Sequence, residues 1–153
     1  MKSSSLQPVH LKTARRRPRK CFDVSQAGRS LVLVRRIVAD VVRAHSQLDE
    51  LQETIEAAQA SGRRSLVREA HGDILRAAEE IRSCMAELRD VGAELTDWSH
   101  GSVDFPAVVN EREVRLCWRL DEPHVRHWHD AGQTCAERRP VQMHLSSTPQ
   151  ADG

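Results

Sequence analysis

Apolar residues recur every three or four positions through a long first part of the chain. The first run has this spacing throughout, and its members are Val34, Ile37, Val41, Ala44, Leu48, Leu51, Ile55 and Ala58. Such spacing is typical of the contact seam of a coiled-coil helix. Asp23 or Ser25 is suited to cap the start of this helix, because either side chain can accept a hydrogen bond from a free backbone N–H. Gly62 predicts its end.

A second run with the same spacing predicts a second helix, for which Ser65 is a candidate N-cap. Its members are Val67, Ala70, Ile74, Ala77, Ile81, Cys84, Leu88, Val91 and Leu95. Two long helices joined by a short turn fold back on each other, so we expect an antiparallel helical hairpin over about residues 24–95. Cys84 lies on the seam and is expected to be a small core residue.

Further apolar positions flank the two seams and would stay exposed in an isolated hairpin. They are Val38, Val42, Leu75 and Met85. The C-terminal part of the chain, a second copy of the chain, or both must cover them. This is the physical reason to expect a homodimer formed through the hairpin.

The period changes to two residues after the hairpin, which is typical of strands. The segments SVDFPAVV, EVRLCWRL and VRHWHD predict a three-stranded antiparallel sheet over about residues 102–130, packed on the hairpin. Pro106 has no N–H donor and therefore places its strand at a sheet edge or a bulge. The predicted fold class is mainly α with a small β unit (α+β), in a single domain over about residues 22–140.

Composition and charge set limits on location and partners. Seven of the first 20 residues are Lys or Arg and none is acidic, so residues 1–20 are expected to be a disordered, solvated basic tail. Nucleic acid binding is a minor alternative that would depend on this tail alone. Residues 141–153 are expected to be a flexible tail. There is no run of roughly 20 apolar residues and no secretory signal, so we expect a cytoplasmic protein without membrane contact.

The cysteines do not predict a disulfide framework. Cys21, Cys84, Cys117 and Cys135 are scattered and form no CxxC pair. In a chain of this kind we expect reduced thiols.

Candidate chemistry gathers on one face of the predicted sheet. If Trp128 shares a face with Leu116 and Trp118, then Asp104, Cys117, His127 and His129 point to the opposite face. A thiolate, an imidazole and a carboxylate can hold zinc or another divalent transition metal. The candidate metal or ligand residues are therefore Asp104, Cys117 and His129.

Charged residues near this face suit an anion better than a cation. Arg115 and Arg119 would stabilise a thiolate or clamp a carboxylate or phosphate, but they would repel a metal ion. Together with Glu122 they are expected to support an anion or the surrounding structure.

A purely structural interpretation stands beside the metal or ligand site and is favoured over it. In this interpretation Trp118 and Trp128 close the sheet against the hairpin, Cys117 fills a gap, and His129 bonds to a backbone group or to Asp130. The chain has no HExxH, no CxxC and no Gly-rich phosphate loop, so enzymatic activity is disfavoured but left open. The leading hypothesis is a non-enzymatic interaction or structural module, and the alternative is a metal- or small-ligand-binding protein around Asp104, Cys117 and His129.

A series of short motifs in the C-terminal part resembles a bacterial family known as domain of unknown function 2203. The matching residues are Gly101, residues 103–107 (VDFPA), 112–114 (REV), 116–120 (LCWRL), 122–123 (EP), 128–129 (WH), Gly132 and residues 139–140 (RP). The resemblance covers about residues 22–140 and implies no established activity. His124, His127 and Cys135 depart from the family pattern, so a site built from them would be peculiar to this chain.

Overall fold

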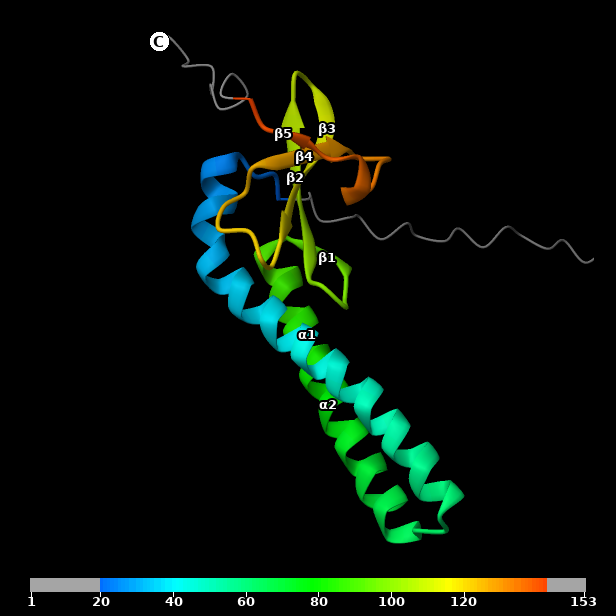
Figure 1. Cartoon of the computed structure of the whole chain (residues 1–153). Coiled ribbons are helices and arrows are strands. Elements are labelled where there is room, and N and C mark those ends of the chain that lie inside the picture. Colours follow the sequence, from blue (N-terminus) through cyan, green and yellow to red (C-terminus); the bar gives the residue numbers. More distant parts are fainter. Residues whose placement is uncertain (1–19, 143–153) are drawn as a thin grey trace, which may run out of the picture.

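A long helical hairpin carries a small antiparallel sheet at one end (Figure 1). The computed structural model describes residues 20–142. Apart from Lys20, Val141 and Gln142, the predicted basic and C-terminal tails lie outside these residues. Helix α1 spans Val24–Ala60 and helix α2 spans Arg64–Val91. The hairpin predicted from the 3-4 spacing is therefore present. No helix among residues 20–142 is long and apolar enough to cross a membrane.

The ends of the two helices agree only in part with the predicted ends. Asp23 caps α1, since its carboxylate accepts from the Gln26 N–H at 2.7 Å while the Gln26 side chain accepts from the Asp23 N–H at 3.0 Å. Arg63, rather than Ser65, stands at the N-cap of α2. Helix α2 ends at Gly92, which takes a left-handed conformation with φ 97°. Leu95 continues the apolar spacing but belongs to the first strand.

Within residues 20–142 the sheet has five strands, so the predicted number of three is wrong. They are β1 (Glu94–Asp97), β2 (Ser102–Val109), β3 (Arg112–Arg119), β4 (His127–Asp130) and β5 (Arg139–Pro140). The strands follow one another in sequence order, and each neighbouring pair is antiparallel. The three predicted strands correspond to β2, β3 and β4. The pattern missed β1 because its apolar residue continues the helical spacing, and β5 because it is only two residues long.

Pro106 occupies the kind of place that its missing N–H requires. Strand β1 pairs with β2 only as far as Asp104, so β2 is an edge strand at Pro106. The carbonyl oxygen of Pro106 instead accepts from the backbone N–H of Phe22 at 2.7 Å. This contact ties the start of α1 to the sheet.

The hydrophobic core lies between the hairpin and one face of the sheet. Its fully buried members include Val34, Val38 and Val41 from α1 and Val103, Phe105 and Trp118 from the sheet. The Trp118 Nε1–H donates to the Glu122 carbonyl oxygen at 3.0 Å, and the Arg35 guanidinium lies 5.2 Å from its ring centroid. Trp128 packs at the edge of this core, with Arg139 4.3 Å from its ring centroid. Trp118 thus lies within the core, and Trp128 packs against it from the outside.

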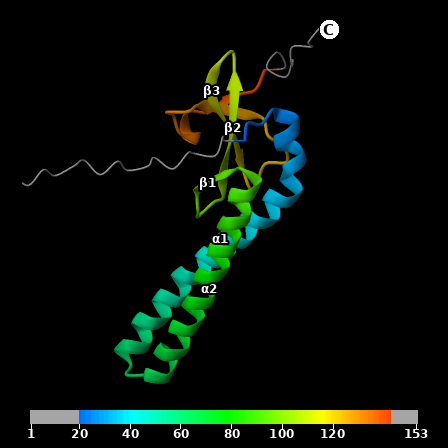
Figure 2. The same ribbon diagram turned by 180° about the vertical axis from the view of Figure 1, so that it is seen from behind.

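Beyond the sheet, the two helices continue alone as a two-helix segment, here called the arm, which includes Leu48, Leu51 and Ile55 of α1 and Leu75 of α2. The view from behind shows the paired helices projecting away from the strands (Figure 2). In this arm the seam residues Leu48, Leu51 and Ile55 are only half-buried. Leu75 is 72% exposed. The arm thus has a continuous contact between its helices but no thick core.

Candidate metal centre

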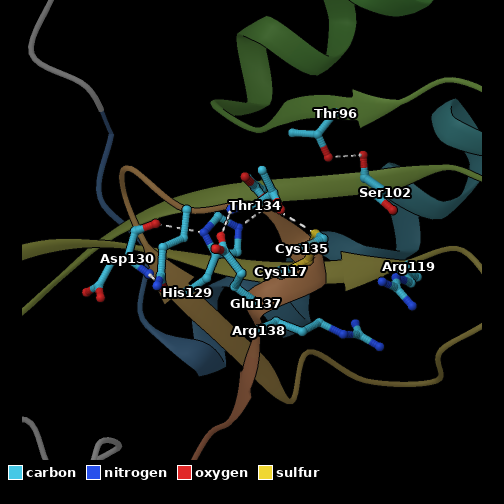
Figure 3. Close-up of polar contacts among 12 residues, drawn as sticks. Thr96, Ser102, Cys117, Arg119, His129, Asp130, Thr134, Cys135, Glu137 and Arg138 are labelled. Atoms are coloured by element: carbon cyan, nitrogen blue, oxygen red, sulfur yellow. Dashed lines mark hydrogen bonds and ion pairs between the residues drawn. A yellow bond between two sulfur atoms is a disulfide. The ribbon is translucent and has the colours of Figure 1, made fainter.

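Four potential metal ligands meet on the sheet face that points away from the core. Asp104 comes from β2, Cys117 from β3, His129 from β4 and Cys135 from the short 3-10 helix η1 (Cys135–Glu137). One ligand atom of each residue lies within 4.8 Å of those of the other three. Cys117, His129 and Asp104 are buried, and Cys135 is half-buried. Figure 3 shows Cys135 approaching Cys117 from the segment that crosses the sheet.

Strand register brings the first three of these residues together. Leu116 pairs with Trp128, which places the apolar side chains on one face, as the sequence predicted. Asp104 lies directly opposite Cys117, and His129 pairs with Arg115, one step along the same face. The predicted candidates Asp104, Cys117 and His129 therefore meet.

His127 was expected on this face but does not join the cluster. Its Nδ1 lies 3.3 Å from a Glu122 carboxylate oxygen instead. The predicted third strand, VRHWHD, began at Val125. Strand β4 begins only at His127, and Val125 is buried in the hydrophobic core. The predicted third strand was therefore too long at its start.

Cys135 is the member of the cluster that sequence reasoning missed. Its sulfur is joined to that of Cys117 in a disulfide, across a Cα–Cα distance of 6.3 Å. The expectation of reduced thiols is therefore wrong for this pair. The segment after β4 folds back over the sheet, and it has no apolar periodicity from which that path could be predicted. Cys84 is buried on the helical seam as expected.

The segment that carries Cys135 is fixed by short-range hydrogen bonds. The Thr134 N–H donates to a Glu137 carboxylate oxygen at 2.9 Å, which caps the 3-10 helix. The Gln133 side chain accepts from the Asp130 N–H at 3.2 Å and from Arg139 at 3.1 Å. These bonds place Cys135 over β3.

His129 is oriented in the way that metal-binding histidines usually are. Its Nδ1 lies 2.8 Å from the carbonyl oxygen of Asp130. A carbonyl oxygen can only accept, so Nδ1 carries the hydrogen and a neutral ring has its lone pair on Nε2. Nε2 lies 3.2 Å from Asp104 Oδ1. Two acceptors thus face each other unless a proton or a metal ion lies between them.

Asp104 is a carboxylate in an unfavourable environment. Burial raises the pKa of Asp104 above its ordinary value of 3.8, and the nearby His129 and Arg115 oppose this increase only in part. Cys135 Sγ lies 3.7 Å from Asp104 Oδ1. A cation held at this point would compensate the buried charge.

The charged residues predicted to support the site have different roles. Glu122 accepts from the Arg119 backbone N–H at 2.9 Å and from the Arg138 guanidinium at 2.6 Å, so it fixes the turn after β3. Arg115 acts on Asp104 through its charge. Arg119 lines a cleft of about 900 Å³, whose wall also includes Asp104 and Cys135. The cleft gives solvent a route to one side of the cluster.

Comparison with known proteins gives a family and no activity. A family model described as "Uncharacterized conserved protein (DUF2203)" matches residues 20–141. No curated protein and no solved structure gives a match.

Proposed function

The chain belongs to the DUF2203 family of uncharacterized conserved proteins, whose description names no activity, so we propose a function from the site alone. We propose that the protein binds zinc through Asp104, Cys117, His129 and Cys135 when both cysteines are reduced. The observation that carries this proposal is the approach of four ligand atoms to within 4.8 Å of one another.

The donor set favours zinc and related transition metals over magnesium and calcium. Two thiolates and an imidazole are soft or intermediate ligands, which select zinc and related transition metals over magnesium or calcium. Zinc binds four such ligands in a tetrahedron. The hydrogen bond from His129 Nδ1–H to the Asp130 carbonyl supplies the orientation that zinc-bound histidines usually receive from a second partner.

A centre of this kind has a structural role. Four protein ligands fill a tetrahedral zinc ion, whereas a catalytic zinc keeps one position for water or substrate. The metal would join β2, β3 and β4 to the segment that carries Cys135. The disulfide joins only β3 to that segment. This role agrees with the non-enzymatic character expected from the sequence.

Metal analysis of the reduced protein tests the proposal. The full chain is purified with a reducing agent and dialysed against a buffer that contains only a trace of zinc. It is expected to retain about one zinc ion per chain, because all four ligands come from the folded protein. The double variant Cys117→Ser, His129→Ala should lose it. The matched control Cys21→Ser, His124→Ala changes the same residue types at two exposed positions and should keep it. Near-zero zinc in both the unaltered protein and the control would overturn the proposal.

The arm of the hairpin supports a second proposal, which concerns assembly. No segment of residues 20–142 covers the outer side of this arm, where Leu75 is 72% exposed. A second copy offers the same exposed Leu75 and the same half-buried apolar residues of the arm, and two such hairpins can pair as a four-helix bundle. We therefore propose a homodimer through the arm. Sedimentation should give a dimer that Leu75→Glu weakens, and a strict monomer at high concentration would overturn this proposal.

A further inference from the structure

The disulfide and the proposed metal need the same two sulfur atoms. A sulfur bonded in a disulfide has no thiolate to give to a metal, so the oxidised pair cannot act as zinc ligands. Two thiolates on one tetrahedral zinc lie roughly 3.8 Å apart. Cys117 and Cys135 have a Cα–Cα distance of 6.3 Å, which is inside the normal range for a disulfide. A small side-chain movement therefore separates the two states.

We infer that the site is a peroxide-sensitive switch, in which oxidation of Cys135 and Cys117 to the disulfide expels zinc. This inference rests on the proposed zinc binding. The oxidant is hydrogen peroxide or a small organic hydroperoxide. The switch has a metal-bound reduced state and a metal-free oxidised state, and the disulfide shown in Figure 3 is the oxidised one.

The reaction has two steps, and its electrons and atoms balance. The Cys135 thiolate attacks one peroxide oxygen, the O–O bond breaks, and the departing hydroxide (an alkoxide, if the oxidant is an organic hydroperoxide) takes a proton to become water (or an alcohol). The Cys117 thiolate then attacks the Cys135 sulfenic acid, the S–S bond forms, and a second hydroxide leaves and takes a proton. Two electrons pass from the sulfurs to the peroxide. Zinc keeps its charge and leaves because it has lost two ligands.

Exposure of the two sulfurs sets the order of these steps. Cys117 is fully buried, whereas Cys135 is half-buried and lines the cleft of about 900 Å³. Ser102 and Thr134 lie on the same wall. A peroxide that enters the cleft reaches Cys135 first. Cys117, held beneath it on β3, is then the resolving thiol.

In the oxidised state, the four site residues keep contacts with one another without the metal. His129 Nε2 and Asp104 Oδ1 lie 3.2 Å apart, within hydrogen-bond distance of each other, in the metal-free disulfide state. The disulfide keeps the segment around Cys135 attached to β3. The switch therefore changes metal occupancy while leaving the fold in place. A protein of this kind releases zinc under oxidative conditions and can bind it again after reduction.

Peroxide treatment of the zinc-loaded full chain tests the switch, with zinc release followed by a chromogenic chelator and disulfides located by peptide mass spectrometry. We expect one zinc to be released for each Cys117–Cys135 disulfide formed, and zinc to bind again after dithiothreitol. Zinc that stays bound after peroxide treatment, or leaves without this disulfide, would overturn the switch alone. A reduced protein that never binds zinc would overturn the proposed function itself.

The order of attack is tested separately, in metal-free reduced protein that carries Cys21→Ser to remove an exposed thiol. A dimedone probe labels sulfenic acids. With Cys117→Ser added, we expect peroxide to give a labelled Cys135. With Cys135→Ser added, Cys117 should label far more slowly. Equal or faster labelling of Cys117 would overturn the order. Circular dichroism checks that both variants fold, and zinc release from the unaltered protein needs no variant.

Discussion

The arm of the hairpin and the sheet end of the molecule are built in opposite ways. The arm repeats one kind of contact between α1 and α2, and ion pairs within a helix, such as Arg82–Glu79, are exposed. Such pairs contribute little to stability. At the sheet end, the start of α1 packs against the sheet, with Trp118 fully buried on one face and the metal-ligand cluster on the other. Tolerance of substitution should therefore be high in the arm and low at the sheet.

Removal of the largest buried side chain should give the greatest contrast. Trp118→Ala should lower the free energy of unfolding by about 3–5 kcal/mol, because it leaves a cavity and removes the hydrogen bond from the indole N–H to the Glu122 carbonyl oxygen. Leu75→Ala in the arm should change it by less than about 0.5 kcal/mol in the monomer. Urea denaturation followed by circular dichroism measures both. Similar losses for the two variants would show that the arm and the sheet do not differ in this way.

Zinc should stabilise the sheet end and leave the arm unchanged. At a free zinc concentration 100 times the dissociation constant, the reduced protein should gain about 2.7 kcal/mol. Hydrogen exchange is expected to slow in β2, β3 and β4, with little change in the outer parts of α1 and α2. The oxidised protein provides the control, because its two cysteines are already bonded. Equal stabilisation of reduced and oxidised protein would point to zinc binding elsewhere.

Two glycines give a finer comparison. A Cβ at Gly101, which has φ +84°, would come within 2.7 Å of a Val38 methyl group. Gly101→Ala should therefore cost about 2 kcal/mol from backbone strain and crowding. At Gly28 in α1, no heavy atom of residues 20–142 outside the immediate helix backbone lies within 4 Å of such a Cβ. Gly28→Ala should stabilise the protein by about 0.5–1 kcal/mol. Thermal unfolding distinguishes the two, and a stabilising Gly101→Ala would contradict the close packing of the sheet on α1.

A last comparison concerns thiol reactivity on the helical seam. Burial, with the nearby Asp40 and Glu80, raises the pKa of the Cys84 thiol above its ordinary value of 9.0. In the oxidised protein, maleimide should label the exposed Cys21 quickly. If labelling of Cys84 needs a local opening of about 3 kcal/mol, it should be roughly 100-fold slower. Stopped-flow labelling with mass spectrometry gives both rates. Equal rates would mean that the seam is open at Cys84.

The same contrast explains what could be predicted from the sequence. The apolar residues that hold the hairpin together recur every three or four positions along each helix, so the pattern is visible in the sequence itself. The alternation of Leu116, Cys117 and Trp118 was likewise enough to predict the faces of β3 and the meeting of Asp104, Cys117 and His129. Leu95 misled the prediction because its spacing fits the helix, and only Gly92 marks the helix end.

Cys135 was out of reach for a different reason. Its position depends on a few hydrogen bonds of Gln133, Thr134 and Glu137, which are specific to the folded loop. Cys117 and Cys135 are 18 residues apart in the sequence, and nothing in this spacing predicts that they form a disulfide. The helices could thus be predicted from periodicity. The complete cluster could not, because it depends on the path of a segment that has no repeating pattern.

The coordination of bound zinc tests the central claim most directly. X-ray absorption of the reduced, zinc-loaded full chain should show two sulfur ligands at about 2.3 Å and two nitrogen or oxygen ligands at about 2.0–2.1 Å. Peroxide treatment should remove this signal from the protein fraction. A zinc ion with only nitrogen and oxygen ligands, or a spectrum unchanged by Cys117→Ser, would contradict the account.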